Sequence, residues 1–431
     1  MNASGLMTSS GAVKPAVYLH YLVMVMMCAY LLADMMSGFT QIYMGLDLKI
    51  SLIYKTPLFA LLLLLIARYH LGWAVGLLVT LMLLLIGPTA AFYRHVNIGL
   101  FFADFGYVVK LLMPITVVLY FGQLYRFAPD FAFRWGKRIL WSAFAILCFN
   151  FVLASIGIGK GTYQLEDDET AGSTGLIYAG NELGAAFLVV FGYALHQIWN
   201  SGRFYVYLLA SAITLGCGLL VATKTTMLAA VLLVTFIPIV NERQHLFRLT
   251  WLKIKILSPF VLAVVALVIL IADLLEAIGL YDRIVWFYEQ RGLIGILWSG
   301  RDQFLSQMIH IYLAQSSLFE QIFGQGIFVG ELHPFGKASA EVDTVDALMW
   351  FGFLGLTVCL AFYSWSFVKS LSRLTVSGSS FGPYLALSNG LLILLSQLSG
   401  HIWFSGTLGI VFGVMNSLIW FEFSRNVEKS K

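Results

Sequence analysis

The chain has 431 residues, of which 60% are apolar and 11% charged, and its formal net charge is +4. Its mean hydropathy is +0.85. Soluble domains carry about 25% charged residues, so this composition excludes a soluble globular protein. The apolar runs are long and unbroken rather than short and alternating, which excludes a β-barrel and predicts membrane-spanning helices.

Apolar runs of spanning length recur along the whole chain. The first is too long for a signal peptide and no A-x-A cleavage pattern follows it, so we expect an uncleaved first span. We therefore predict an all-α polytopic membrane protein, with residues 1–431 forming one integral membrane domain. The predicted spans are about twelve in number, near 17–36, 51–67, 72–93, 105–122, 139–157, 176–197, 204–222, 226–240, 257–276, 347–367, 382–399 and 403–421.

The distribution of charge predicts how these spans are oriented. With the N-terminus in the cytoplasm, the cytoplasmic segments hold 16 Lys and Arg against 4 Asp and Glu, a net charge of +12, and the remainder nets −8. Cytoplasmic loops of membrane proteins are rich in Lys and Arg. We expect both termini in the cytoplasm, and the two longest loops, 158–175 and 277–346, on the outer face. The loop 277–346, between spans nine and ten, is the predicted location of the active site.

A helix start within the long outer loop carries a basic side chain. Ser299-Gly300-Arg301-Asp302 has the S-x-x-D form of a helix cap, and apolar residues follow at helical spacing. A helix N-terminus favours anions, and a guanidinium adds a bidentate fork for phosphate. Local sequence alone favours the alternative, in which Arg301 forms a surface ion pair with Asp302 or Glu320.

Two carboxylates lie at the edge of the tenth predicted span, in Glu341-Val342-Asp343. A partly desolvated carboxylate there can serve as a general base, although its spacing alone favours a solvated acidic loop end. An E-x-D pair could also hold a divalent metal, but no further ligand cluster stands near it and His333 has no HxxxH companion. We expect no metal and no cofactor. Arg291, His333 and Asp343 are candidate substrate-binding residues.

Several polar residues interrupt or border the spans. Lys224 lies in the tight outer turn between spans seven and eight, where the positive-inside rule disfavours a lysine. Asn181 and Glu182 lie in the outer half of span six, where a carboxylate is costly and faces a partner or a wet cavity. These three are candidate substrate-binding residues. For the remaining charges within spans we expect structural pairing; they are Asp34, Asp104, Lys110 and Asp273.

Four features together resemble the superfamily of bacterial O-antigen polymerases and O-antigen ligases, from about residue 172 to 356. One is the layout of twelve spans with a major outer loop between nine and ten. Ser299-Gly300-Arg301, followed by Phe323-Gly324-Gln325-Gly326, is similar to the S-G-R … G-x-G loop of that family. Thr223-Lys224-Thr225-Thr226-Met227-Leu228 is similar to its S-R-T-A-L turn, with lysine in place of arginine. Gly180-Asn181-Glu182-Leu183 is similar to its P-N-x-L segment.

The resemblance favours a polymerase within that superfamily. Ligases carry His followed by Asn, Ser or Gln, then nine residues and G-x-x-G. Gly352-Phe353-Leu354-Gly355 fits the second half, but Glu341-Val342 stands where the ligase has its histidine. The implied general base is then Glu341.

The resemblance also implies substrates, partners and a location. The reaction would polymerise oligosaccharide repeat units, carried on polyprenyl pyrophosphate, into the surface polysaccharide of lipopolysaccharide. Arg301 and Lys224 would stabilise the pyrophosphate leaving group without a metal. The protein would be a multi-pass component of the bacterial inner membrane, in contact with membrane lipids and a chain-length regulator protein. No nucleic acid would be bound.

The sequence is also compatible with other membrane functions. Twelve spans also suit a secondary transporter, but transporters usually have repeated halves with polar groups near the membrane midplane. A flippase would have basic residues lining a central cavity, for which Lys110 alone is thin support. A polyprenyl-phosphate sugar transferase would carry an acidic pair in the first outer loop, where residues 37–50 hold only Asp47. Transfer of the glycan to a lipid acceptor, as in the ligases, is the nearest alternative.

Overall fold

The computed structural model describes most of the helical chain. The described residues are 14–164, 170–245, 248–251, 253–258, 301–331, 338–374 and 380–429, with positions 285, 288, 289, 292 and 376. Within these residues, nine helices are long and apolar enough to cross a membrane. The protein is therefore an all-α polytopic membrane protein at the level of its class, as the composition predicts.

The long helices follow the apolar runs closely, because each run can satisfy its backbone hydrogen bonds internally only as a helix. Leu71–His95 forms one span that bends at Leu85, where Pro88 lacks the N–H that would bond to Leu84. The elements are α1 (Lys14–Tyr43), α2 (Ile50–Tyr69), α3 (Leu71–Leu84), α4 (Ile86–His95), α5 (Ile98–Phe127), α6 (Pro129–Ser155), α7 (Gly180–Asn200), α8 (Phe204–Val221), α9 (Lys224–Asn241), α12 (Arg301–Gln315), α13 (Leu318–Phe323), α14 (Asp343–Leu374), α15 (Gly382–Leu398) and α16 (Gly409–Lys429), with short 3-10 turns at Arg243–His245 and Gly326–Glu331.

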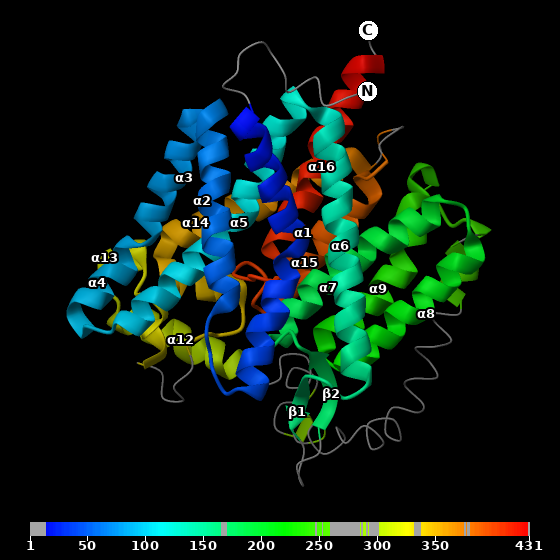
Figure 1. The fold of residues 1–431 in the computed structure, drawn as a ribbon. Coiled ribbons are helices and arrows are strands. Elements are labelled where there is room, and N and C mark those ends of the chain that lie inside the picture. The colour runs from blue at the N-terminus through cyan, green and yellow to red at the C-terminus, as the bar shows by residue number, and fades with distance from the viewer. Residues whose placement is uncertain are drawn as a thin grey trace.

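The centre of the bundle is the contact between α5 and α16 (Figure 1). Small residues let these helices approach closely: a Cβ on Gly413 would lie 2.6 Å from Val117 Cβ, and one on Gly122 would lie 3.0 Å from the Trp420 indole nitrogen. Large aromatic side chains fill the surrounding space, among them Phe121 and Phe412. This packing places the start of α16 deep in the protein.

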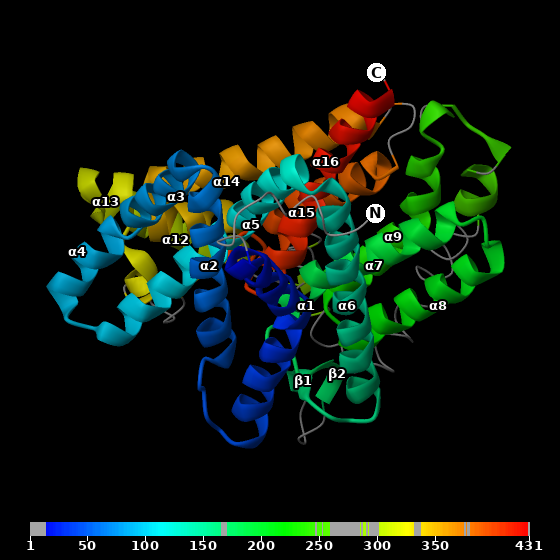
Figure 2. The same cartoon turned by 45° about the horizontal axis from the view of Figure 1, so that its top comes forward.

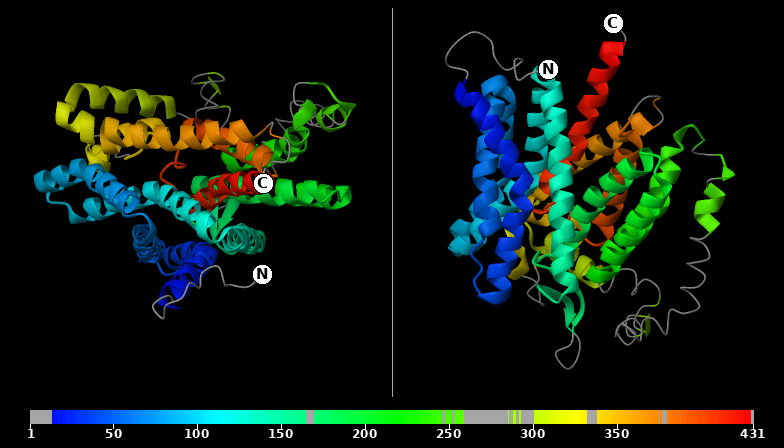
Figure 3. Two further views of the ribbon diagram at one scale, coloured as in Figure 1. Left: turned by 90° about the horizontal axis from the view of Figure 1, so that it is seen from above. Right: turned by 45° about the vertical axis from the view of Figure 1, so that its right-hand side comes forward.

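The start of α1 and the end of α16 lie opposite the β-hairpin in the bundle (Figure 1). The helix α1 begins and α16 ends at one end, and a β-hairpin projects from the other (Figures 1 and 2). Seen from above, α14 lies across the bundle, between α12–α13 and the layer that contains α4 and α5 (Figure 3).

Two features of the fold differ from the sequence prediction. The segment 158–175 contains an antiparallel hairpin, β1 (Lys160–Gln164) and β2 (Thr170–Gly175), in a chain predicted to be all helical. The last helix begins at Gly409 rather than near 403, because the residues before it bond to carboxylates of other helices. The ninth predicted span, 257–276, lies outside the described residues except for its first two positions.

Candidate functional site

An ion pair joins the first residue of α12 to the residue that lies two positions before α14. Arg301 Nε donates a hydrogen bond to Glu341 Oε2 at 2.7 Å, and Arg301 Nη1 donates to the carbonyl oxygen of Leu398, at the end of α15, at 2.9 Å. The two side chains are 17% and 27% exposed. The pair is therefore anchored between three helices and still accessible from outside the protein.

The backbone of Glu341 is held in the left-handed region, with a φ of 58°. This conformation costs about 1–2 kcal/mol for a residue with a side chain and persists only where the surroundings impose it. Asp346 provides those surroundings: its carboxylate accepts from Ser339 Oγ at 2.7 Å and from the Ala340 N–H at 2.6 Å, and Ser339 Oγ accepts from the Glu341 N–H at 2.9 Å. Asp346 thus builds the turn that directs Glu341 toward Arg301.

The segment 399–408 connects α15 to α16 without helical structure, although it is mostly buried. Asp343, itself fully buried, accepts hydrogen bonds from the backbone N–H groups of Ile402 at 2.9 Å and Trp403 at 3.1 Å. These bonds replace the helical ones that buried backbone would otherwise need. Asp343 therefore positions this segment beside Glu341; a Cβ on Gly400 would lie 2.5 Å from the Glu341 carbonyl carbon.

A second carboxylate holds the far half of the same segment. Glu182 Oε2 accepts from Ser405 Oγ at 3.1 Å and from the backbone N–H groups of Gly406 at 2.8 Å and Thr407 at 3.2 Å. Its Oε1 accepts from Lys110 Nζ at 3.3 Å. The neighbouring Asn181 donates to the Ser399 carbonyl oxygen at 3.2 Å. The first turn of α7 is thus attached to both ends of the segment 399–408.

An imidazole completes this cluster. His401 lies on the segment between Asp343 and Glu182, and its backbone is also left-handed, with a φ of 59°. Burial lowers the pKa of its imidazole from 6.5, while the charges of Glu341 and Glu182 oppose that shift and those of Lys110 and Arg301 add to it. This lowering favours the neutral ring, which can accept a proton at one nitrogen and donate one at the other.

Lys224 lies at the start of α9, and its side chain is exposed. Thr223 caps this helix by accepting from the Thr226 N–H at 3.2 Å. Two glycines of α7 pack against the same turn: a Cβ on Gly180 would lie 3.4 Å from Thr223 Cγ2, and one on Gly184 would lie 2.7 Å from Thr226 Oγ1. The N-terminal end of α7 therefore lies between the Lys224 turn and the segment 399–408.

The structure brings most of the predicted site residues to one region. Arg301, Glu341 and Asp343 meet directly around the segment 399–408, and Asn181 and Glu182 bind the same segment. Of the two alternative partners of Arg301, Glu320 pairs with Arg94 instead, and the side chain of Asp302 lies outside the described residues. Lys224 lies beyond the first turn of α7. Ser299, Arg291, His333 and Asp273 lie outside the described residues.

The expected structural pairing of charges within spans is observed for two of the described residues. Asp34 pairs with Lys55 and Lys110 pairs with Glu182, whereas Asp104 accepts a hydrogen bond from the backbone N–H of Ile327 at 2.8 Å. Sequence reasoning assigned no role in the site to His401, Lys110 or Asp346. The signal for His401 is Ser399-Gly400-His401, a polar turn between two apolar runs.

The two glycine motifs, 323–326 and 352–355, pack against each other. A Cβ on Gly324 would lie 2.2 Å from the Trp350 carbonyl oxygen, and one on Gly352 would lie 2.3 Å from that of Ile322. Gly352 has a φ of 64° and bends α14 at this contact. Neither position can take a side chain without moving the backbone, so the glycines bring α13 against α14.

No known family model matches this chain, and no curated protein matches its sequence. Among the described residues, no group of three or more His, Cys, Asp or Glu side chains is arranged to hold a metal ion. Within the part of the chain that the structure describes, the cluster combines a guanidinium that uses two of its five N–H donors, a carboxylate beside it and an imidazole. Such groups can bind an oxyanion and accept a proton at one place.

Proposed function

We propose that the protein is a membrane glycosyltransferase that joins lipid-linked oligosaccharide repeat units into a surface polysaccharide. The observation that carries this proposal is the partly open ion pair between Arg301 and Glu341. Transfer of a sugar from polyprenyl pyrophosphate needs a cation for the leaving group and a base for the acceptor hydroxyl at one site. The resemblance to O-antigen polymerases supports the same reaction.

The guanidinium retains capacity for the leaving group. An arginine has five N–H donors, and within the described residues Arg301 uses one for Glu341 and one for Leu398. Three donors thus remain for pyrophosphate oxygens, which arginine binds in a bidentate manner. Lys224 supplies a second charge from the start of α9, and Asp343 and Glu182 act by holding the segment 399–408 in place.

The pairing also gives a means of activating the base. Bound pyrophosphate brings negative charge to the guanidinium beside Glu341, and a like charge nearby raises the proton affinity of a carboxylate. Glu341 then removes the proton of the acceptor hydroxyl while that oxygen bonds to the anomeric carbon. The pyrophosphate departs with the electron pair of the broken C–O bond, and His401 passes the proton onward.

We propose twelve spans in the bacterial inner membrane, with both termini in the cytoplasm and the site on the outer face. The charge distribution supports this orientation, as does the common end at which α1 begins and α16 ends. In a cysteine-free background, an impermeant maleimide should label Lys49→Cys in intact spheroplasts and not Arg134→Cys. Labelling of Arg134→Cys but not of Lys49→Cys would show the opposite orientation.

Transfer of the glycan to a lipid acceptor is the second candidate. The specific observation in its favour is His401, which places an imidazole beside Glu341, although not at the ligase position of the sequence.

The product that accumulates in a gene deletion separates these functions. A polymerase deletion leaves glycan of a single repeat, a ligase deletion leaves polymer that is not attached, and a transporter deletion leaves normal glycan with lost uptake. We expect the single repeat, and complementation by wild type but not by Arg301→Ala. Full-length polymer from both Arg301→Ala and Lys224→Ala would remove the proposed anion site.

A further inference from the structure

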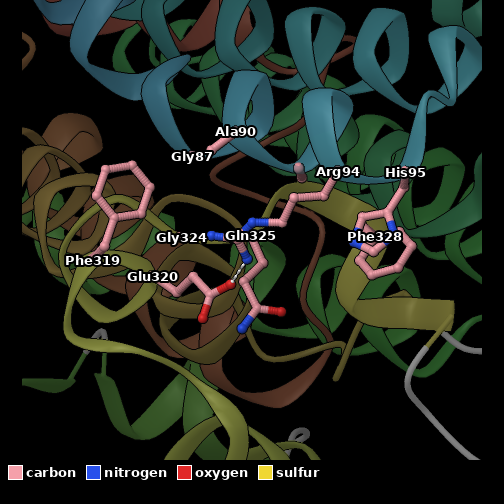
Figure 4. Close-up of a pocket in the computed structure, with 10 residues that line it drawn as sticks. Gly87, Ala90, Arg94, His95, Phe319, Glu320, Gly324, Gln325 and Phe328 are labelled. Carbon is pink, nitrogen blue, oxygen red and sulfur yellow. Dashed lines mark hydrogen bonds and ion pairs between the residues drawn. The ribbon is translucent and has the colours of Figure 1, made fainter.

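A separate pocket of about 270 Å³ opens between α4 and the α13 region (Figure 4). One wall is α4, where Ala90 and Ala91 leave room beside Gly87, which packs directly on the Phe323 backbone, and the other is formed by α13 and the turn at Gly324 and Gln325. The volume lies just below the lower end of the range of about 300–1,000 Å³ for small-molecule sites. The pocket is therefore the size of one small ring compound rather than of a long lipid chain.

An ion pair spans the pocket. Arg94 Nη1 donates to Glu320 Oε1, and their side chains are 51% and 12% exposed. Burial raises the pKa of Glu320, but hydrogen bonds from Ser317 and the charge of Arg94 outweigh it and lower the pKa overall. Gln325 Nε2 donates to Ser316 Oγ at 2.9 Å, and no described residue donates to its amide oxygen. The site thus offers fixed donors and acceptors with no excess charge.

Aromatic rings flank these polar groups. His95 stacks on Phe328 with ring centroids 3.5 Å apart and an interplanar angle of 13°, and Phe319 lies on the other side of the ion pair in this view (Figure 4). Aromatic faces are electron-rich and attract weakly positive hydrogens. The axial C–H groups of a pyranose ring present such hydrogens, while its hydroxyl groups both donate and accept hydrogen bonds.

We propose that this pocket binds one pyranose unit of the glycan, away from the reacting centre. A phosphate fits it poorly, because Glu320 already neutralises Arg94 and would repel an anion. A lipid tail fits poorly because it would cover the ion pair without replacing its hydrogen bonds to water. The hydroxyl groups of a neutral polyol can accept hydrogen bonds from Arg94 and donate them to Glu320.

The pocket is mechanically connected to the site proposed for transfer. The Gln325 N–H donates to the Met349 carbonyl oxygen at 3.1 Å, and Asp343 lies six residues earlier on α14, about 9 Å along a helix. An oligosaccharide can span such a separation. The assignment of the bound sugar to a growing glycan rests on the proposed function, whereas the binding of a pyranose does not.

Binding can be measured without turnover. The probes are methyl pyranosides of glucose, galactose, mannose and N-acetylglucosamine, followed by saturation-transfer NMR on the full chain in nanodiscs. We expect at least one probe to bind wild type, and Ala91→Trp, which fills the pocket, to weaken its binding by about tenfold or more. Val79→Trp, at a position on α3 that is half exposed, is the matched control and should bind like wild type.

A second variant guards against misfolding of the first. Glu320→Gln keeps the S-x-x-E/Q capping box with Ser317 and removes the charge, so it should weaken the pyranoside while the melting temperature stays close to that of wild type. Unchanged binding in Ala91→Trp, or no binding of any probe to wild type, overturns the proposal. Binding of glycerol phosphate in place of the sugar, and more tightly to Glu320→Gln than to wild type, would also overturn the proposal.

The sugar pocket and the catalytic site can be contradicted independently of each other. If Arg301→Ala abolishes elongation while Ala91→Trp binds the pyranoside like wild type, only the sugar pocket is wrong. If the pocket variants lose binding while Arg301→Ala and Glu341→Gln elongate normally, only the catalytic assignment is wrong.

Discussion

Two carboxylate–cation pairs in this protein differ in how the fold encloses them. Asp34 and Lys55 join α1 to α2, and each side chain is 6% exposed. Both residues belong to regular helices. Arg301 and Glu341 are 17% and 27% exposed, and Glu341 has a left-handed backbone. The first pair is sealed and unstrained, whereas the second is open and strained.

The difference indicates different roles. A charged pair sealed in a bundle connects helices and exchanges with no ligand, and its charges must stay together because either alone is costly there. An open pair on a strained turn can separate when an anion arrives. Four experiments test this difference between the two pairs and the acidic groups around them.

The largest effect is expected for the open pair. Glu341→Gln keeps the shape of the side chain but cannot take a proton, so elongation should fall by about 10²–10⁴. Glu341→Asp should retain part of the activity, and EDTA should leave wild-type elongation unchanged. The assay is elongation of lipid-linked substrate by purified protein. Wild-type elongation by Glu341→Gln would leave only the cationic part of the site.

For the sealed pair we expect a large loss of stability instead. Lys55→Met leaves Asp34 buried without its partner and should lower the free energy of unfolding by about 3–5 kcal/mol, measured by equilibrium unfolding in mixed micelles. Asp34→Leu combined with Lys55→Met should restore most of it and should retain most of the elongation activity. A double variant that folds well but is inactive would place this pair in the functional site after all.

A smaller effect should separate strain from chemistry at Glu341. Glu341→Gly and Glu341→Ala both remove the ion pair, but only glycine also removes the left-handed penalty, so Glu341→Gly should be more stable than Glu341→Ala by about 1 kcal/mol. The same variant should be inactive. Equal stability of Glu341→Gly and Glu341→Ala in the same unfolding assay would contradict the strain at this turn.

The smallest effect concerns pH. The pKa of Glu320 is lowered in the folded protein, mainly because the Ser317 hydrogen bonds and Arg94 overcome the effect of burial. Its contribution to stability is therefore complete above its ordinary pKa of 4.5 and is lost as the pH falls through the lowered value. Glu320→Gln should show a shallower loss of melting temperature on acidification. An identical pH profile would contradict the pairing.

The helices were predictable because a run of spanning length has one stable backbone structure in a bilayer. The hairpin and the segment 399–408 were not. Trp403 and Phe404 are apolar and were predicted to begin the last span. Asp343 instead accepts hydrogen bonds from the backbone N–H groups of Ile402 and Trp403. Hydropathy counts side chains along one segment and contains no information about a carboxylate about sixty positions away.

The candidate site was predictable in part. Arg301 and Glu341 were both selected from local patterns, one as a helix cap and one as a span edge, and nothing local connected them. His401 was missed because no local motif marks its turn, which is held by Asp343 and Glu182 from two other helices.

By itself, the sequence determined the membrane class, the extents of most helices and the polar residues that are costly to bury, because these follow from local hydropathy and charge. The tertiary structure alone decided which charges meet, where α16 begins and why Glu341 is strained. Those features depend on hydrogen bonds between residues far apart in the chain, such as Asp343 to Ile402 and Glu182 to Gly406, and on glycines whose missing side chains become visible only where two backbones touch.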